Sequence, residues 1–136
     1  MKMALLAWRG WLLPLGFAAA IVVESSQSGV PLPAGVWQVD KIAHFLAFGL
    51  LATMTMRALR IQSHAWRAVA AVLLVSLFGA SDEVHQHFTP GRSCDIFDWL
   101  ADTLGAGTAV SLYLFWPAWR RVLEIGPGAR KTSAQS

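Results

Sequence analysis

Acidic side chains and histidines in two short segments of this 136-residue chain have the types and spacing that proton transfer or cation binding requires. In residues 40–44, Asp40 and His44 lie four positions apart and therefore share one face of a helix. A second helical stripe, with spacings of three and four, comprises Gly79, Asp82, Glu83 and Gln86. Carboxylates crowded together in this way can retain a proton near neutral pH. We therefore treat Asp82, Glu83 and His44 as candidate proton donors and acceptors.

A turn and a further helix bring more charged residues next to these segments. Pro90 and Gly91 predict a tight turn, because proline fixes φ and glycine permits a positive φ. The helix that follows begins near Asp95, whose carboxylate can cap it. The candidate binding residues for a charged ligand are Asp40, Lys41, Gln86, Arg92, Asp95, Asp98 and Asp102.

Composition indicates the solvent around these residues. Hydrophobic residues make up 55% of the chain and charged residues 14%, against about 25% charged in a soluble domain. So small a protein buries only about two-thirds of its chain surface on folding, and these few polar groups cannot cover the rest. We therefore expect a membrane protein and exclude a water-soluble monomer. The single cysteine, Cys94, excludes an internal disulfide.

Four apolar stretches are long enough, or nearly so, to cross a hydrocarbon layer, which takes about 20 helical residues. They cover residues 5–23, 42–59, 65–81 and 96–119. The sequence thus predicts an all-α fold, a four-helix transmembrane bundle that occupies residues 1–124 as a single domain. Residues 125–136 are expected to form a short, basic, disordered tail. A cleaved signal peptide is the alternative for the first stretch, but the apolar run continues past its small residues.

Charge placement predicts the orientation of the bundle. Of the 11 lysines and arginines, only Lys41 and Arg92 fall outside the N-terminus, the connection between the second and third stretches, and the C-terminus. Those three regions share one side of a four-span protein, and the positive-inside rule makes that side cytoplasmic. Both termini are therefore expected in the cytoplasm and the candidate site on the opposite face, where Glu24 is taken as a solvated loop residue. Basic charges that mark loops give no indication of nucleic-acid binding.

The fourth stretch carries small residues next to its acids. Ala101, Gly105 and Ala109 recur every four positions, a spacing that lets two helix backbones approach closely. Asp98 and Asp102 adjoin this stripe, so we expect them to face the bundle. A charge facing lipid would instead cost at least about 2.5–3.5 kcal/mol. The sequence therefore predicts a shared, partly hydrated pocket between the helices.

Taken in order, these segments resemble the VanZ-like family of small bacterial membrane proteins. The resemblance extends over about residues 40–107. Its motifs are D-K-I-A-H at 40–44, D-E-V-H-Q at 82–86, P-G-R-S at 90–93, aspartates at 95 and 98, and A-D-T-L-G at 101–105. The family pattern often has asparagine at the position of Asp102, so this chain adds a potential negative charge there.

The resemblance implies a multi-pass protein of the bacterial inner membrane. The family's named member is associated with low-level resistance to teicoplanin-type glycopeptide antibiotics, which act on outward-facing cell-wall precursors. A link of this chain to such resistance, or to envelope homeostasis, is an implication of the resemblance alone. The resemblance implies no particular reaction, so whether the protein is an enzyme stays open.

Our first functional hypothesis is an outward-facing site for an anionic lipid or a lipid-linked envelope precursor. Arg92 would hold a phosphate through its planar guanidinium, with Lys41 as a second positive charge. Binding alone and binding followed by hydrolysis or group transfer both stay open. The lipid bilayer is the partner that the composition predicts, and the sequence predicts no oligomeric state.

Three alternatives stay open beside this hypothesis. One alternative is a divalent-cation cofactor, although the sequence contains no tight ligand motif. Its oxygen and nitrogen ligands could come from His44, Asp82, Glu83, His85 and Asp98. A small four-span transporter would need a mid-membrane acid that residues 5–23 do not contain. A structural or partner-binding subunit would use the polar residues as a latch between helices, although each polar pair contributes only about 0.6–2 kcal/mol.

Overall fold

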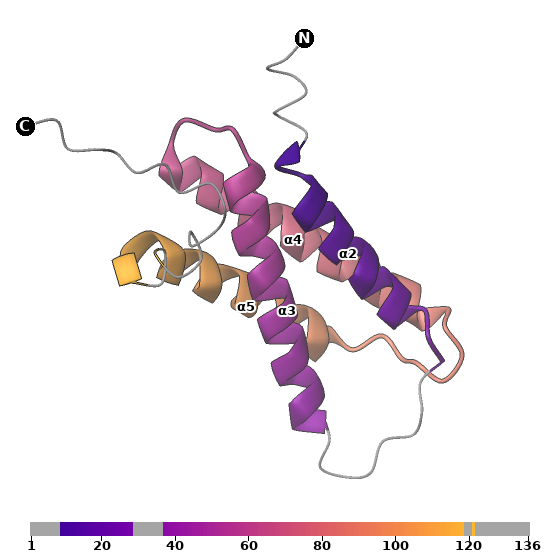
Figure 1. Ribbon diagram of the computed structural model, residues 1–136. Helices are drawn as coiled ribbons and strands as arrows, with labels where there is room; N and C mark the ends of the chain where they lie inside the picture. Colours follow the sequence, from indigo (N-terminus) through magenta and orange to yellow (C-terminus); the bar gives the residue numbers. More distant parts are fainter. Residues whose placement is uncertain (1–8, 29–36, 119–120, 122–136) are drawn as a thin grey trace, which may run out of the picture.

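The computed structural model describes residues 9–28, 37–118 and 121, which contain helices and turns but no strand. The helices are α2 (Leu12–Ser25), α3 (Trp37–Ala58), α4 (His64–His87) and α5 (Ile96–Phe115), as Figure 1 shows. The predicted all-α class is confirmed for this part of the chain. Lys2 and the predicted tail at 125–136 lie outside the described residues.

Side-chain caps explain where two of the helices begin. The Ser63 hydroxyl accepts a hydrogen bond from the backbone N–H of Trp66 at 3.3 Å and so caps α4. The Asp95 carboxylate accepts one from the backbone N–H of Phe97 at 2.8 Å and caps α5. Each bond satisfies an N–H group that the first turn of a helix leaves without a partner. The sequence predicted the cap at Asp95.

Two helices do not end where the predicted apolar stretches end, and for α4 the helical stripe through Gln86 already predicts this. α5 stops at Phe115 rather than at residue 119, because Trp116 precedes a proline and takes an extended conformation, with ψ of 97°. α4 continues beyond residue 81 to His87. This extension matters for the site, because it keeps Asp82 and Glu83 on a regular helix whose spacing fixes which way their side chains point.

Helix direction alternates along the first three helices. α2 and α4 begin at the same end of the molecule at which α3 finishes (Figure 1). The ends of α2 and α4 and the beginnings of α3 and α5 lie toward the opposite end. α3 and α4 each pack against the other three helices, and the most extensive contact is between α3 and α5.

Glycines set the very close approach of α3 and α5. A Cβ on Gly105 would lie 2.1 Å from the backbone oxygen of Phe45, a distance that no real contact allows. A Cβ on Gly49 would lie 3.0 Å from the backbone oxygen of Gly105 and 3.2 Å from the Cβ of Ala109. The predicted role of the small-residue stripe in backbone approach is therefore confirmed.

The interior is small and the surface is strongly apolar. Buried hydrophobic side chains from three helices form the core: Phe48, Leu51, Ala52 and Met56 of α3, Ala68, Ala71 and Val75 of α4, and Ala106 and Val110 of α5. Large hydrophobic side chains on all four helices are exposed, including Leu13 at 72%, Leu77 at 68% and Leu104 at 63%. A soluble monomer rarely exposes apolar patches of this extent, whereas a lipid-facing surface requires them.

Within the described residues, two helices are long and apolar enough to cross a membrane. They are the segments Val39–Ala58 of α3 and His64–His87 of α4, and α2 is a shorter apolar helix. α5 has 20 residues but is not among the candidate membrane spans. Length and composition therefore fit a membrane protein, as the sequence analysis predicted.

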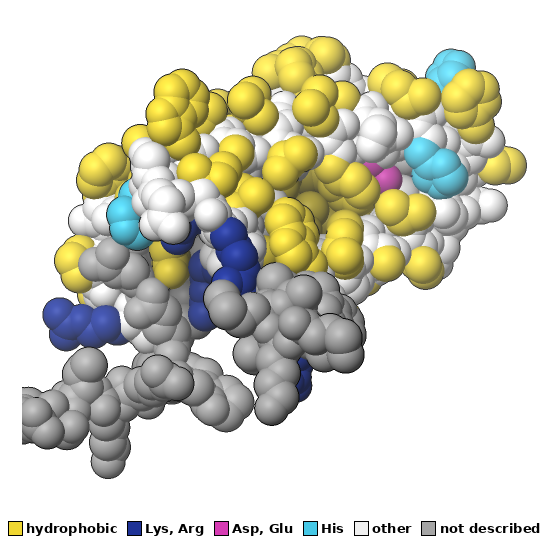
Figure 2. All heavy atoms as spheres, turned by 90° about the horizontal axis from the view of Figure 1, so that it is seen from above, with side chains coloured by type: hydrophobic (Ala, Val, Ile, Leu, Met, Phe, Trp, Pro, Cys, Tyr) yellow, Lys and Arg dark blue, Asp and Glu magenta, His cyan; other side chains and the backbone are white. Residues whose placement is uncertain are grey.

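Basic side chains gather in one part of the surface. Figure 2 shows lysine and arginine side chains together in one region, while hydrophobic side chains cover most of the rest of that face. A groove of about 390 Å³ lies where α3 ends and α4 begins, and Arg57, Arg60 and Arg67 line it. The guanidinium of Arg67 donates to the backbone oxygen of Ile61, with a distance of 2.9 Å from Nε. This basic groove lies at the end of the molecule away from the polar residues described next.

Candidate functional site

Polar side chains from three helices meet where α3 and α5 begin and α4 ends. We call this group the polar cluster; it comprises Asp40, Lys41, His44, Asp82, Glu83, Gln86, Asp95, Asp98 and Asp102. The stripe predicted on α4 is buried along its length, at Gly79, Asp82, Glu83 and Gln86. The aspartates of α5 are buried as well, with Asp98 5% and Asp102 0% exposed.

Lys41 lies between two carboxylates of α5. Its ammonium donates to Asp95 Oδ2 at 2.5 Å and forms a second, short contact with Asp98 Oδ1. The Lys41 side chain is 14% exposed and that of Asp98 is 8% exposed, so the pair is largely removed from solvent. The charge of Lys41 is therefore engaged within the protein, and it ties the start of α3 to the start of α5.

His44 is oriented by Asp102. The Nδ1 atom of His44 lies 2.9 Å from Asp102 Oδ1, and the imidazole stacks on the ring of Phe48 with centroids 5.9 Å apart. Asp102 is completely buried, and its second oxygen, Oδ2, has no hydrogen-bond partner among the described residues. A carboxylate that contacts one imidazole nitrogen fixes the ring and leaves Nε2 available for a second interaction.

Asp82 connects α4 to α2. Its Oδ2 accepts hydrogen bonds from the Ser25 hydroxyl at 2.7 Å and from the Gln86 amide at 3.0 Å. Its other oxygen, Oδ1, is buried without a partner among the described residues. Ser25 is itself 1% exposed, although it sits at the end of an apolar helix. The contact therefore anchors α2 to the polar cluster.

Glu83 contacts the beginning of α5. Its Oε2 accepts a hydrogen bond from the backbone N–H of Asp95 at 2.7 Å, next to the cap that Asp95 provides. The other oxygen, Oε1, is buried and has no partner in the part of the chain that the structure describes. Three buried carboxylates of the cluster, those of Asp82, Glu83 and Asp102, therefore each keep one oxygen without a hydrogen-bond partner among the described residues.

Arg92 lies beside the cluster on the loop after α4. Its Nη2 atom donates to Glu24 Oε1 at 2.6 Å and to the Glu24 backbone oxygen at 3.4 Å. The Glu24 side chain is 66% exposed and that of Arg92 is 20% exposed, and Arg92 Nε is buried without a partner among the described residues. Ion pairs this accessible to solvent contribute only about 0–1 kcal/mol, so an anionic ligand can compete for Arg92.

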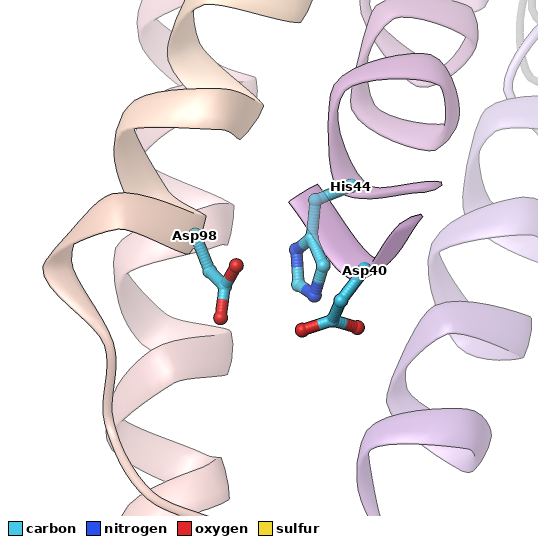
Figure 3. Close-up of side chains that lie close together, drawn as sticks. All are labelled: Asp40, His44 and Asp98. Atoms are coloured by element: carbon cyan, nitrogen blue, oxygen red, sulfur yellow. The ribbon is translucent and has the colours of Figure 1, made fainter. Parts of the chain in front are cut away.

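Two overlapping groups of ligand atoms surround His44. One nitrogen or oxygen from each of His44, Glu83 and Asp102 lies within 4.8 Å of the others, and the same holds for Asp40, His44 and Asp98. Figure 3 shows the imidazole of His44 next to the carboxylates of Asp40 and Asp98. These residues have the donor types that divalent metal ions take from proteins. Of the other residues predicted for a cation, His85 lies apart, with Nε2 3.0 Å from the Ser26 hydroxyl.

A pocket of about 450 Å³ opens beside the polar cluster, between α2 and α3. We call it the α2–α3 pocket; its lining residues are Phe17, Ala20, Ile21, Glu24, Ser25, Ala43, His44, Ala47, Phe48 and Asp82. One part of the wall is apolar, and the other carries the hydroxyl, imidazole and carboxylate groups. Its volume falls within the range of about 300–1,000 Å³ that small-molecule sites occupy.

The contribution of α2 to this site was not predicted from the sequence. The prediction that Glu24 is solvated is confirmed, since its side chain is 66% exposed, but the residue lies in the last turn of α2 rather than in a loop and pairs with Arg92. Ser25 and Ser26 were not singled out, yet they contact Asp82 and His85. Three consecutive polar residues after a long apolar run were the available signal. These polar residues did not indicate a site by themselves, because any helix that ends at a membrane surface has polar residues at its end.

Helices with an exposed apolar surface around a buried cluster of acids are typical of one class of protein, the helical membrane proteins. Within that class the chain belongs to the VanZ/LLP1 family, because the model of that family matches residues 10–117. The family assignment made from the motifs is therefore confirmed. The comparisons with curated proteins and with solved structures gave no match.

Proposed function

We propose that this protein binds an amphiphile with an anionic headgroup, a lipid or a lipid-linked envelope precursor, in the α2–α3 pocket. The observation that carries the proposal is the composition of the pocket wall. Phe17, Ile21 and Phe48 supply an apolar surface, and Glu24 and Ser25 lie at the end nearest Arg92. A molecule with an acyl chain and a polar headgroup likewise has an apolar part and a polar part, which match the two parts of the pocket wall.

Arg92 is the residue that we assign to the headgroup phosphate. Its guanidinium can form two parallel hydrogen bonds to phosphate oxygens, and only the solvent-exposed Glu24 carboxylate would have to yield. From the sequence, Lys41 was expected to act as a second positive charge for the phosphate. Its ammonium contacts both Asp95 and Asp98, so binding an anion there would separate two ion pairs. We therefore assign the anion to Arg92 alone.

Binding by itself accounts for the shape of the pocket. If a hydrolysis or a group transfer followed binding, Asp82, Glu83 and His44 would be the groups able to donate or accept protons. His44 and Asp82 line the pocket directly, whereas Glu83 lies behind them against the start of α5. This order makes His44 and Asp82 the first residues to test for a reaction.

The proposal includes a position in the bacterial inner membrane. All four helices would cross it, with both termini in the cytoplasm and the polar cluster near the outer surface. Two observations support this orientation. The basic groove of Arg57, Arg60 and Arg67 lies at the opposite end of the molecule from the cluster, as the positive-inside rule requires. The acids of the cluster lie at the end with few basic residues. A link to glycopeptide resistance or envelope homeostasis would follow from an outward-facing precursor site.

Lipid co-purification tests the proposal. We expect mass spectrometry of the purified full-length protein to detect a bound anionic phospholipid or precursor, and Arg92→Ala to lose most of it. Arg60→Ala, at the other end of the molecule, is the matched control and should retain the lipid. An equal lipid content in wild type and Arg92→Ala would overturn the assignment of the headgroup.

A second pair of variants tests the apolar part of the pocket. Ala20 lines the pocket, whereas the adjacent Ala19 is exposed and does not. Ala20→Trp should therefore displace the acyl chain, and Ala19→Trp should leave lipid binding unchanged. Equal lipid retention in both variants would show that the amphiphile binds elsewhere.

A further inference from the structure

We propose that His44, Glu83 and Asp102 bind one divalent transition-metal ion. The three side chains come from α3, α4 and α5, and each offers a ligand atom within 4.8 Å of the other two. His44 Nδ1 and Asp102 Oδ1 are 2.9 Å apart. This hydrogen bond fixes the imidazole beside the carboxylate, so the two side chains are already held next to each other for a shared ion.

Two orphaned oxygens provide an independent indication of a bound cation. Glu83 and Asp102 are 3% and 0% exposed, and Glu83 Oε1 and Asp102 Oδ2 accept no hydrogen bond from any described residue. A buried carboxylate oxygen without a partner is costly, because it loses its hydration and gains nothing in exchange. A metal ion between these residues would satisfy both oxygens at once.

The charge around His44 favours a cation over any other ligand. The carboxylates of Asp40 and Asp98 lie next to the imidazole, as Figure 3 shows, and they belong to the second ligand group that includes His44. The ammonium of Lys41 contacts Asp98 and Asp95, and neither of these is among the three proposed ligands. The three ligands together carry two carboxylates and one imidazole, which matches a doubly charged ion.

The donor set indicates which ions would bind. Magnesium and calcium take oxygen ligands almost exclusively, whereas an imidazole with two carboxylates suits zinc or manganese. The ion would sit next to the α2–α3 pocket, because His44 lines that pocket. This inference does not depend on lipid binding, since Arg92 and the apolar wall of the pocket contribute no ligand to the metal.

Metal titration of the purified full-length protein tests the inference. After chelator treatment, we expect one equivalent of Zn²⁺ or Mn²⁺ to bind, measured by elemental analysis and calorimetry, and to raise the unfolding temperature. His44→Gln, Glu83→Gln and Asp102→Asn should each weaken binding by more than about tenfold, since even an outer-shell partner is worth roughly 10–100-fold.

Two control variants carry the same chemistry outside the proposed ligand set. His85→Gln removes an exposed histidine that contacts Ser26, and His87→Gln removes a second exposed histidine of α4. Both should bind the metal within about twofold of the wild type. If one ligand variant does not fold, metal binding by the other two ligand variants tests the proposed site.

Either of two results would overturn the metal site. One is the absence of stoichiometric Zn²⁺ and Mn²⁺ binding by the wild type. The other is a loss of binding in the controls as large as in the ligand variants. The lipid content of Arg92→Ala is a separate measurement, so failure of the metal site leaves the lipid proposal to be decided by its own experiment.

Discussion

Gly79 makes room for the carboxylate of Asp102. A Cβ at position 79 would lie 2.7 Å from Asp102 Oδ2 and 3.2 Å from Cε1 of Phe48, so any larger residue on α4 would press on the acid of α5. The buried position of Asp102 therefore depends on the absence of a side chain on the neighbouring helix. This relationship also explains why His44, which Asp102 orients, points into the cluster.

Gly79→Ala should therefore displace Asp102. Overpacking of this kind costs about 1–3 kcal/mol of folding free energy, measured by thermal or denaturant unfolding in detergent. Gly16→Ala is the control, because nothing lies within 4 Å of a Cβ there. It should be neutral or slightly stabilising, since alanine is the better helix former. Equal stability of the two variants would mean that the cluster accommodates the extra methyl group.

The contact between Gly105 and Phe45 predicts a larger effect. A Cβ on Gly105 would meet the backbone oxygen of Phe45, which cannot rotate away as a side chain can. Gly105→Ala should therefore cost more than about 3 kcal/mol or prevent α3 and α5 from packing. Gly107→Ala, two residues further along, has open space and should unfold like the wild type. A small effect of Gly105→Ala would contradict the close approach of these helices.

Removal of the Lys41 ammonium should deprive the Asp95 and Asp98 carboxylates of a counter-charge. We expect Lys41→Met to destabilise the protein by about 3–5 kcal/mol, because one partner of a buried ion pair then lacks its counter-charge. Adding Asp98→Asn should recover part of that loss, since the more buried of the two acids becomes neutral. A double-mutant cycle on unfolding free energies measures the coupling. Additive losses would show that the two residues do not interact.

Asp95 has two roles that one pair of variants can separate. It caps α5 through the backbone N–H of Phe97 and pairs with Lys41. Asp95→Asn keeps a capping oxygen but loses the charge, whereas Asp95→Ala loses both. We expect the alanine variant to be less stable than the asparagine variant by about 0.5–2 kcal/mol, the usual value of a cap. Identical unfolding of the two variants would assign the whole contribution to charge.

The single cysteine allows a direct test of orientation. Cys94 is exposed on the segment between α4 and α5, beside the polar cluster. A membrane-impermeant maleimide should label it in intact spheroplasts. A Cys94→Ser, Gln62→Cys variant, with its thiol between α3 and α4, should be labelled only after permeabilisation. The reverse pattern would invert the proposed topology.

Local features of the site could be predicted from the sequence. The stripe of Asp82, Glu83 and Gln86 and the alignment of Asp98 with Asp102 follow from helical periodicity, which needs no knowledge of neighbours. The cap at Asp95 follows from its type and position. Chain length and composition predicted the all-α class and an apolar exterior, because too few polar residues exist to cover the surface.

Partners across the bundle could not be predicted in the same way. Lys41 and Arg92 both looked available for an anion, but Lys41 contacts Asp95 and Asp98, 54 and 57 positions away. Arg92 contacts Glu24, 68 positions away. Which of these charges remains accessible to a ligand depends on how the helices are rotated about their axes, and no spacing along one helix contains that information.

The sequence by itself determined which residues are polar, which helix carries each of them and which face of that helix they occupy. Only the tertiary structure decided which of them meet. The physical reason lies in the packing between helices: Gly105 against Phe45 and Gly79 against Asp102 fix the distance and rotation of α5 relative to α3 and α4. That packing brings ligand atoms of His44, Glu83 and Asp102 within 4.8 Å of one another and leaves one oxygen of each of the two acids without a partner in the described part of the chain.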